Sequence, residues 1–166
     1  TYHNSNNSTY MSLLAQFYNI LLNLRFPNIS INKQLQIPNS NILKIGFIGR
    51  TFNNHSIGRI SMGLIEKLNQ YSDIITYTYT IPYNHNTNDQ FTKRIYNASK
   101  VYKPLLEQHF IEVIEQIRND NLNIIIIPDA FTDIYMYCLG LYKLAPVQVT
   151  TWGHPDTSGS PNIDYY

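Results

Sequence analysis

The stretch LNIIIIP at residues 122–128 decides the fold class, because its run of isoleucines leaves no polar face for water. A strand that is apolar on both faces is typical of a parallel sheet with helices packed on either side. Three further stretches are rich in apolar, β-branched and aromatic residues: LKIGFIG (43–49), DIITYTYTI (73–81) and VQVTTW (147–152). We therefore predict strands at these four places.

Helical patterns occupy the intervals between these strands. Apolar residues recur at helical spacing over 56–70, 89–98, 104–119 and 132–144, and Pro104 suits the first turn of the third helix. Strands that alternate with helices predict a doubly wound, Rossmann-like α/β fold with right-handed crossovers. Another helix is predicted over 10–26 and ends at Pro27. The predicted division is therefore a polar lead-in, one helix and a linker over 1–41, and the Rossmann-like unit over 42–166.

Composition excludes several classes of partner. Only 14% of the 166 residues are charged and the formal net charge is +1, so no strong field attracts nucleic acid or an anionic membrane. The longest apolar stretch, 11–26, is interrupted by polar side chains, which predicts no transmembrane span. The single cysteine, Cys138, excludes an internal disulfide and a cysteine-based zinc site. We predict no metal site and no cofactor.

Polar residues follow two of the predicted strands, at the sheet edge where doubly wound proteins bind ligands. Asn54 and His55 lie where a helix begins, and unpaired backbone N–H groups there favour an anion. His55 is therefore a candidate general base or phosphate donor; the alternative is that Asn54 or Ser56 caps the helix and His55 is merely exposed. Asp129 is a candidate for orienting a substrate, with helix capping again the alternative.

The last loop, within TWGHPDTSGSPNIDYY (151–166), is dense in glycine and proline and follows a strand directly. Such a loop has a defined conformation, and loops of this kind often carry functional groups. It presents His154, Pro155 and Thr157 as candidate cleft residues. The alternative is an ordinary turn.

The same region resembles a known family. APVQ (145–148), GHPDTSG (153–159) and IDY (163–165) resemble the catalytic region of the O-linked N-acetylglucosamine transferases and SPINDLY-like glycosyltransferases, glycosyltransferase family 41. Upstream, LKIGFIGRTFNNHSIGRISMGLIEKL (43–68) is similar to that family's first strand, Asn-His loop and following helix. GRTFN (49–53) and DAFT (129–132) depart from the family pattern.

The resemblance implies the N-terminal half of a two-domain GT-B glycosyltransferase. Such an enzyme moves a sugar from a nucleotide-sugar donor, for example UDP-N-acetylglucosamine, to serine or threonine hydroxyls of a protein or peptide acceptor. His55 is then the expected catalytic residue, Asn54, Asp129, His154, Pro155 and Thr157 are expected to line the cleft, and the cytoplasm or nucleus is the expected location. The chain would be a fragment that is inactive alone. A non-catalytic Rossmann-like module that binds a peptide or small ligand is the alternative function.

Overall fold

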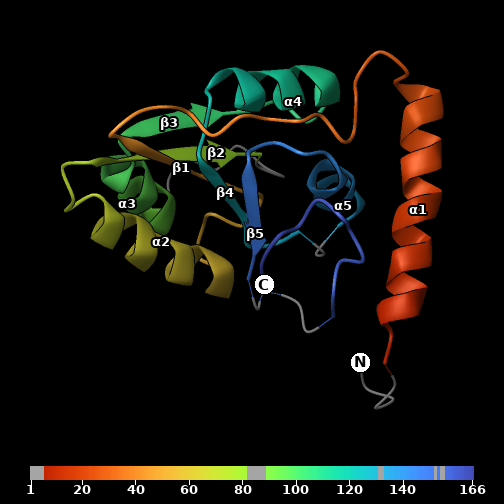
Figure 1. Ribbon diagram of the computed structural model, residues 1–166. Coiled ribbons are helices and arrows are strands. Elements are labelled where there is room, and N and C mark those ends of the chain that lie inside the picture. The colour runs from red at the N-terminus through yellow and green to blue at the C-terminus, as the bar shows by residue number, and fades with distance from the viewer. Residues whose placement is uncertain (1–5, 82–88, 131–132, 152, 154–155) are drawn as a thin grey trace.

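The sheet is built from five parallel strands. The computed structural model describes residues 6–81, 89–130, 133–151, 153 and 156–166. In chain order its elements are α1 (Ser8–Arg25), β1 (Leu43–Gly49), α2 (Ser56–Leu68), β2 (Ile74–Thr80), α3 (Gln90–Ala98), β3 (Val101–Pro104), α4 (Phe110–Asn119), β4 (Ile124–Ile127), α5 (Ile134–Leu141) and β5 (Val147–Thr150). The strand order is β3-β2-β1-β4-β5, and every pairing is parallel (Figure 1). The predicted α/β fold with a doubly wound parallel sheet is confirmed.

The strand order reverses beside β1. From β1 the chain moves outward through β2 to the edge strand β3, and it then crosses back so that β4 lies on the other side of β1. The carboxyl ends of β1 and β4 therefore meet at a topological switch point, where doubly wound sheets bind their ligands.

One strand was missed and one helix start is wrong. Residues 101–104 form β3, in register with 77–80 of β2, and the following helix begins at Phe110 instead of Pro104. Proline is compatible with the first turn of a helix and also with the end of an edge strand. The pairing with β2 decides between them, and the backbone N–H of Leu105 continues it by donating to the Thr80 carbonyl (2.8 Å).

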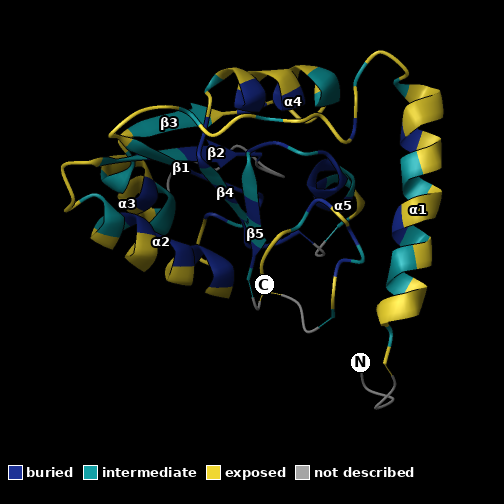
Figure 2. Ribbon diagram, in the orientation of Figure 1, coloured by how far each residue is buried: buried dark blue, intermediate teal, exposed yellow. Residues whose placement is uncertain are grey.

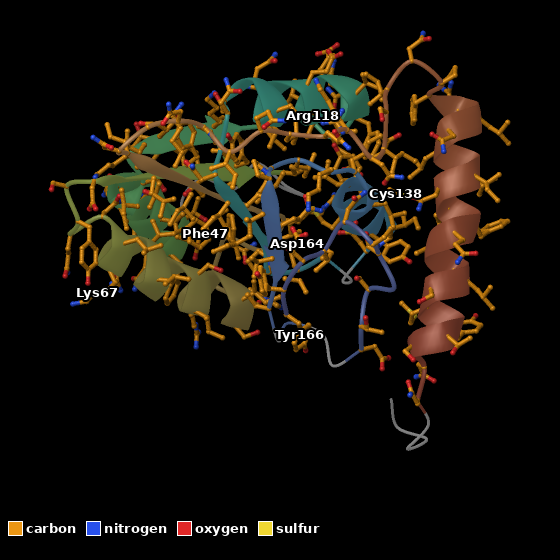
Figure 3. The ribbon with its side chains drawn as sticks, in the orientation of Figure 1. Phe47, Lys67, Arg118, Cys138, Asp164 and Tyr166 are labelled. Carbon is orange, nitrogen blue, oxygen red and sulfur yellow. The ribbon has the colours of Figure 1, made fainter. Side chains whose placement is uncertain are left out.

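Helices cover both faces of the sheet and form two cores. The α2–α3 core consists of Ile45, Phe47, Phe52, Met62, Ile65 and Ile95, and Ile124 and Ile126 of β4 pack against it. The α4–α5 core includes Ile48, Tyr79, Ile114, Ile117, Ile125, Ile127, Leu139 and Tyr142. Phe47 lies on the α2 side of the sheet (Figure 3). The alternation along β4 confirms that its isoleucines are covered on both faces.

Helix α1 packs beside α5 at the end of the molecule (Figure 1). Its buried residues are Ala15 and Leu22, and the Tyr18 ring meets Tyr137 of α5 edge-on at 5.5 Å between centroids. The outer face of α1 carries exposed apolar side chains, which colour it yellow over much of its length (Figure 2): Tyr10, Leu13, Phe17, Ile20, Leu21 and Leu24. The periodicity that predicts this helix therefore marks mainly its solvent-facing side.

A buried arginine connects the segment between α1 and β1 to the rest of the fold through hydrogen bonds. Arg118 of α4, labelled in Figure 3, is 8% exposed. Its guanidinium donates to the carbonyls of Ser30 (2.7 Å) and Lys143 (2.9 Å). Burial lowers the pKa of Arg118, and the two carbonyls give its N–H groups acceptors in the interior.

Candidate active site

The loop after β1 places an exposed imidazole at the start of α2. His55 is the N-cap residue of α2, and its Nδ1 accepts a hydrogen bond from the backbone N–H of Ile57 (3.3 Å). The cap is thus His55 itself, and not Asn54 or Ser56 as the capping alternative has it. Because Nδ1 uses its lone pair on Ile57, the neutral ring carries its proton on Nε2. His55 is therefore a hydrogen-bond donor at a helix N-terminus.

Asn54, the residue before His55, orients a cation. Its Oδ1 accepts from both Nε (3.3 Å) and an Nη (2.7 Å) of Arg59, one turn into α2. The Arg59 guanidinium also lies over the Phe91 ring of α3, 5.1 Å from its centroid. Arg59 was not predicted as a site residue, although residues four apart on a helix lie on the same face, and Arg59 comes four residues after His55.

Asp129 lies beneath this loop and not in an open cleft. The residue is 1% exposed, and its Oδ2 accepts from the backbone N–H of Arg50 (2.8 Å), the backbone N–H of Thr51 (3.2 Å) and the Thr51 hydroxyl (2.9 Å). Burial raises the pKa of the Asp129 carboxyl, and the hydrogen bonds from Arg50 and Thr51 oppose that rise. Helix capping, the alternative for Asp129, is performed at α5 by Asp133, which accepts from Met136 N–H (2.9 Å).

A buried arginine completes this edge of the sheet. Arg50 is 5% exposed, and its guanidinium pairs with Glu107 (2.7 Å) and Asp133 (3.4 Å) and lies over the Tyr135 ring. The hydrogen bond from Arg50 lowers the pKa of Glu107. Sequence reasoning missed Arg50 because its partners come from two later loops. The available signal was an arginine directly after an apolar strand.

The loop after β5 approaches other segments closely. A Cβ at Gly153 would lie 2.3 Å from the Pro128 carbonyl oxygen, so no side chain fits there. Thr157 is exposed, and its hydroxyl accepts from Gly159 N–H (3.3 Å). The Tyr137 hydroxyl donates a hydrogen bond to the backbone carbonyl of Ser158 (3.2 Å). His154 and Pro155 lie outside the described residues, so their predicted place in a cleft stays a prediction.

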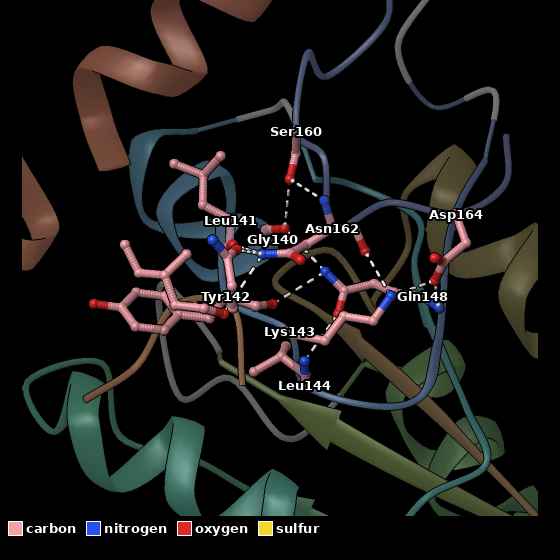
Figure 4. Close-up of polar contacts among 11 residues, drawn as sticks. Gly140, Leu141, Tyr142, Lys143, Leu144, Gln148, Ser160, Asn162 and Asp164 are labelled. Carbon is pink, nitrogen blue, oxygen red and sulfur yellow. Dashed lines mark hydrogen bonds and ion pairs between the residues drawn. The ribbon is translucent and has the colours of Figure 1, made fainter. Parts of the chain in front are cut away.

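Two residues of the family-like motifs stabilise the fold next to this loop (Figure 4). Gln148 is fully buried; its amide donates to the carbonyls of Gly140 (2.9 Å) and Tyr142 (3.1 Å) and accepts from Leu144 N–H (3.0 Å). Asp164 accepts from the backbone N–H of Gln148 (2.7 Å). The two bonds donated by the Gln148 amide satisfy carbonyls at the end of α5, as helix termini require.

The switch point thus brings together the loop that carries Asn54 and His55 and the strand end that carries Asp129. An exposed donor at a helix N-terminus, at the carboxyl edge of a doubly wound sheet, is suited to an anionic group such as a phosphate. Within the part of the chain described, no three His, Cys, Asp or Glu side chains cluster as a metal site would require. None of the helices described there is long and apolar enough to span a membrane.

The chain belongs to glycosyl transferase family 41, whose sequence model matches residues 18–166. It is 26% identical over 141 residues to a UDP-N-acetylglucosamine--peptide N-acetylglucosaminyltransferase of Caenorhabditis elegans, covering 80% of this chain and 11% of the relative. It is 24% identical over 123 residues to the probable enzyme SEC of Arabidopsis thaliana, covering 74% and 12%. The match to the probable enzyme SPINDLY of Eustoma exaltatum is 28% identical over 92 residues and covers 55% and 10%.

A solved structure supports the fold. A mutant O-GlcNAc transferase from Thermobaculum terrenum superposes with a TM-score of 0.73 at 20% identity, over 98% of this chain and 30% of that chain. The resemblance to family 41 stated from the motifs is confirmed. The chain spans about a tenth of the length of the curated relatives.

Proposed function

We propose that this chain forms the acceptor side of the cleft in a protein glycosyltransferase. The whole protein would transfer N-acetylglucosamine from a UDP-sugar to serine or threonine hydroxyls, with no cofactor, in the cytoplasm or nucleus. Membership of family 41 and the names of the C. elegans and Arabidopsis relatives support this reaction. The observation that carries the proposal is His55, an exposed imidazole at the N-terminus of α2 beside the switch point.

The geometry favours one role for His55. Transfer of a sugar leaves negative charge on the departing nucleoside diphosphate, and a positioned donor that stabilises this charge lowers the barrier. With Nδ1 accepting from Ile57, His55 offers its Nε2–H as such a donor, and the N–H groups at the start of α2 add to the favourable field. Removal of the acceptor proton by Nε2 would first require the other tautomer and loss of the cap. We therefore assign His55 to the diphosphate, with Asn54, His154, Pro155 and Thr157 as cleft residues.

The test separates the imidazole from its capping role. In the full-length enzyme, His55→Asn retains a good N-cap residue and removes the ring donor. We expect kcat/KM for UDP-N-acetylglucosamine and an acceptor peptide to fall by roughly 10²-fold or more, as loss of one preorganised donor does. The melting temperature should stay close to that of the wild type.

His109→Asn is the matched control, because His109 is the N-cap residue of α4 and its side chain makes no capping hydrogen bond. It should retain the activity of the wild type. A fully active His55→Asn enzyme would return His55 to a purely structural role. Tight binding of donor or peptide by a full-length protein without any turnover would favour the binding module instead.

A further inference from the structure

The Asp129 carboxylate binds a segment that is distant in sequence. Its Oδ2 accepts from two backbone N–H groups and one hydroxyl of residues 50 and 51, which lie 79 and 78 positions earlier in the chain, respectively. Both partners sit at the switch point, because β1 and β4 are neighbours in the sheet. A buried carboxylate is stable only where donors surround it, so this contact fixes the start of the loop after β1.

The rest of that loop is also confined. At Gly58, in the first turn of α2, a Cβ would lie 2.2 Å from the carbonyl oxygen of Asn53 and 2.6 Å from that of Thr51. The carbonyl of Phe52 accepts from the Thr92 hydroxyl of α3 (3.1 Å). The backbone of residues 50–54 therefore contacts three different parts of the fold: Asp129 after β4, Gly58 of α2 and Thr92 of α3.

Backbone hydrogen bonds connect this loop segment to His55. The backbone N–H of His55 donates to the carbonyl of Asn53 (2.7 Å), and the His55 carbonyl accepts the first helical bond of α2 from Arg59 (2.9 Å). Because the segment from Thr51 to His55 is short and hydrogen-bonded, a shift in the position of Thr51 would also move His55. Catalytic groups misplaced by about 1 Å can lose on the order of 10²-fold in rate.

We propose that Asp129 is a positioning residue for His55: its carboxylate fixes the Arg50–Asn54 segment and so sets where the imidazole stands at the N-terminus of α2. The proposal rests on the proposed function of His55. Asp129 itself touches neither sugar nor diphosphate, because it is almost fully buried beneath the loop. This replaces its expected role as a cleft-lining residue.

The test is a double-mutant cycle in the full-length enzyme, with UDP-N-acetylglucosamine and an acceptor peptide. Asp129→Asn replaces the charged acceptor by a neutral one of similar size. Thr51→Val removes only the hydroxyl donor, and Thr51→Ser restores it. We expect Asp129→Asn and Thr51→Val to lower kcat, by roughly tenfold or more for Asp129→Asn, while the KM for the peptide changes little. Thr51→Ser should recover most of the loss.

In a His55→Asn background, neither Asp129→Asn nor Thr51→Val should lower activity further, because the group they position is gone. Asp120→Asn is the matched control. Asp120 precedes β4 at the opposite edge of the sheet, where it accepts from Lys103 (2.6 Å) and the Tyr79 hydroxyl. That substitution should lower stability and leave kcat unchanged.

Each outcome decides between the proposals. Losses that persist in full on top of His55→Asn would overturn the positioning role and leave the role of His55 intact. An active His55→Asn enzyme would overturn the proposed role of His55 at the diphosphate, and this inference with it, while leaving the transferase function itself in place. If Asp129→Asn fails to fold, Thr51→Val alone completes the cycle, since it keeps the carboxylate in place.

Discussion

His55 and Asp129 both stabilise the loop after β1, and our proposals give each of them a part in catalysis as well. The imidazole caps the first turn of α2 through Nδ1, and this cap does not use Nε2. The Asp129 carboxylate accepts from two backbone N–H groups of the loop after β1. The position of each side chain after an apolar strand is evident in the sequence, and on that basis both were predicted as site residues. The hydrogen bonds between Asp129 and Thr51 were not predictable, because no local pattern relates residues so far apart in the chain.

At the residue scale, Asp129 makes a prediction about pH. Burial raises the pKa of its carboxyl above the ordinary 3.8, so the folded protein keeps the proton to higher pH than the unfolded chain does. Between those two pKa values the folded state binds more protons, and the contribution of Asp129 to stability must fall as pH rises through this window. Asp129→Asn does not titrate. The free energy of unfolding of the wild type relative to Asp129→Asn should therefore decrease from about pH 4 upward.

Urea unfolding of both proteins at several pH values from about 4 to 6 measures this difference. Asp133→Asn is a useful comparison, because Asp133 is less buried and caps α5. A difference that grows with pH would mean that the donors from Arg50 and Thr51 outweigh the cost of burial.

At the element scale, local pattern predicts the interior strands and most helices well. The runs at β1 and β4 are apolar enough that only a covered sheet can hold them. The edge strand β3 has only four residues and no apolar run, and its existence depends on pairing with β2, which the sequence does not display. The strand order, and hence the switch point, likewise arises from contacts between segments. For that reason the sequence could predict the carboxyl edge of the sheet as the place for a ligand site, but it could not predict that the switch point lies beside the central strand β1.

Helix α1 depends on a glycine in the loop after β5. Gly159 has a φ of +63°, and a Cβ there would lie 2.2 Å from the backbone of Met11. Gly159→Ala should cost about 1–2 kcal/mol for the left-handed backbone alone. The clash with Met11 should add to that cost and loosen α1, so trypsin should cleave faster at the exposed Arg25.

Gly63→Ala is the control for this substitution. Gly63 lies within α2, and nothing stands within 4 Å of its Cβ position. The same change should there raise the free energy of unfolding by about 0.5–1 kcal/mol, because alanine is the better helix former. Equal effects at the two glycines, measured by urea unfolding, would show that α1 does not need the close approach at Gly159.

At the scale of the whole molecule, the two faces of one sheet contribute to two separate hydrophobic cores. Ile45 and Ile48 lie on the same central strand and face opposite sides, Ile45 toward the α2–α3 core and Ile48 toward the α4–α5 core. β1 pairs with both β2 and β4. If the helices on one face of the sheet unfolded, they would expose strands whose other face forms the second core. The fold should therefore unfold as one cooperative unit.

Ile45→Val and Ile48→Val test this cooperativity. Each removes one buried methylene and should lower the free energy of unfolding by about 0.5–1.5 kcal/mol. The two residues lie roughly 10 Å apart along the strand, so their effects should add to within about 0.5 kcal/mol in the double variant. Ile37→Val, at a position 70% exposed in the linker, should change little. Circular dichroism and tyrosine fluorescence should follow one urea transition with an unchanged slope in every variant. If Ile45→Val shifted one transition and Ile48→Val another, the two faces would be independent folding units, and the loop at the switch point would belong to only one of them.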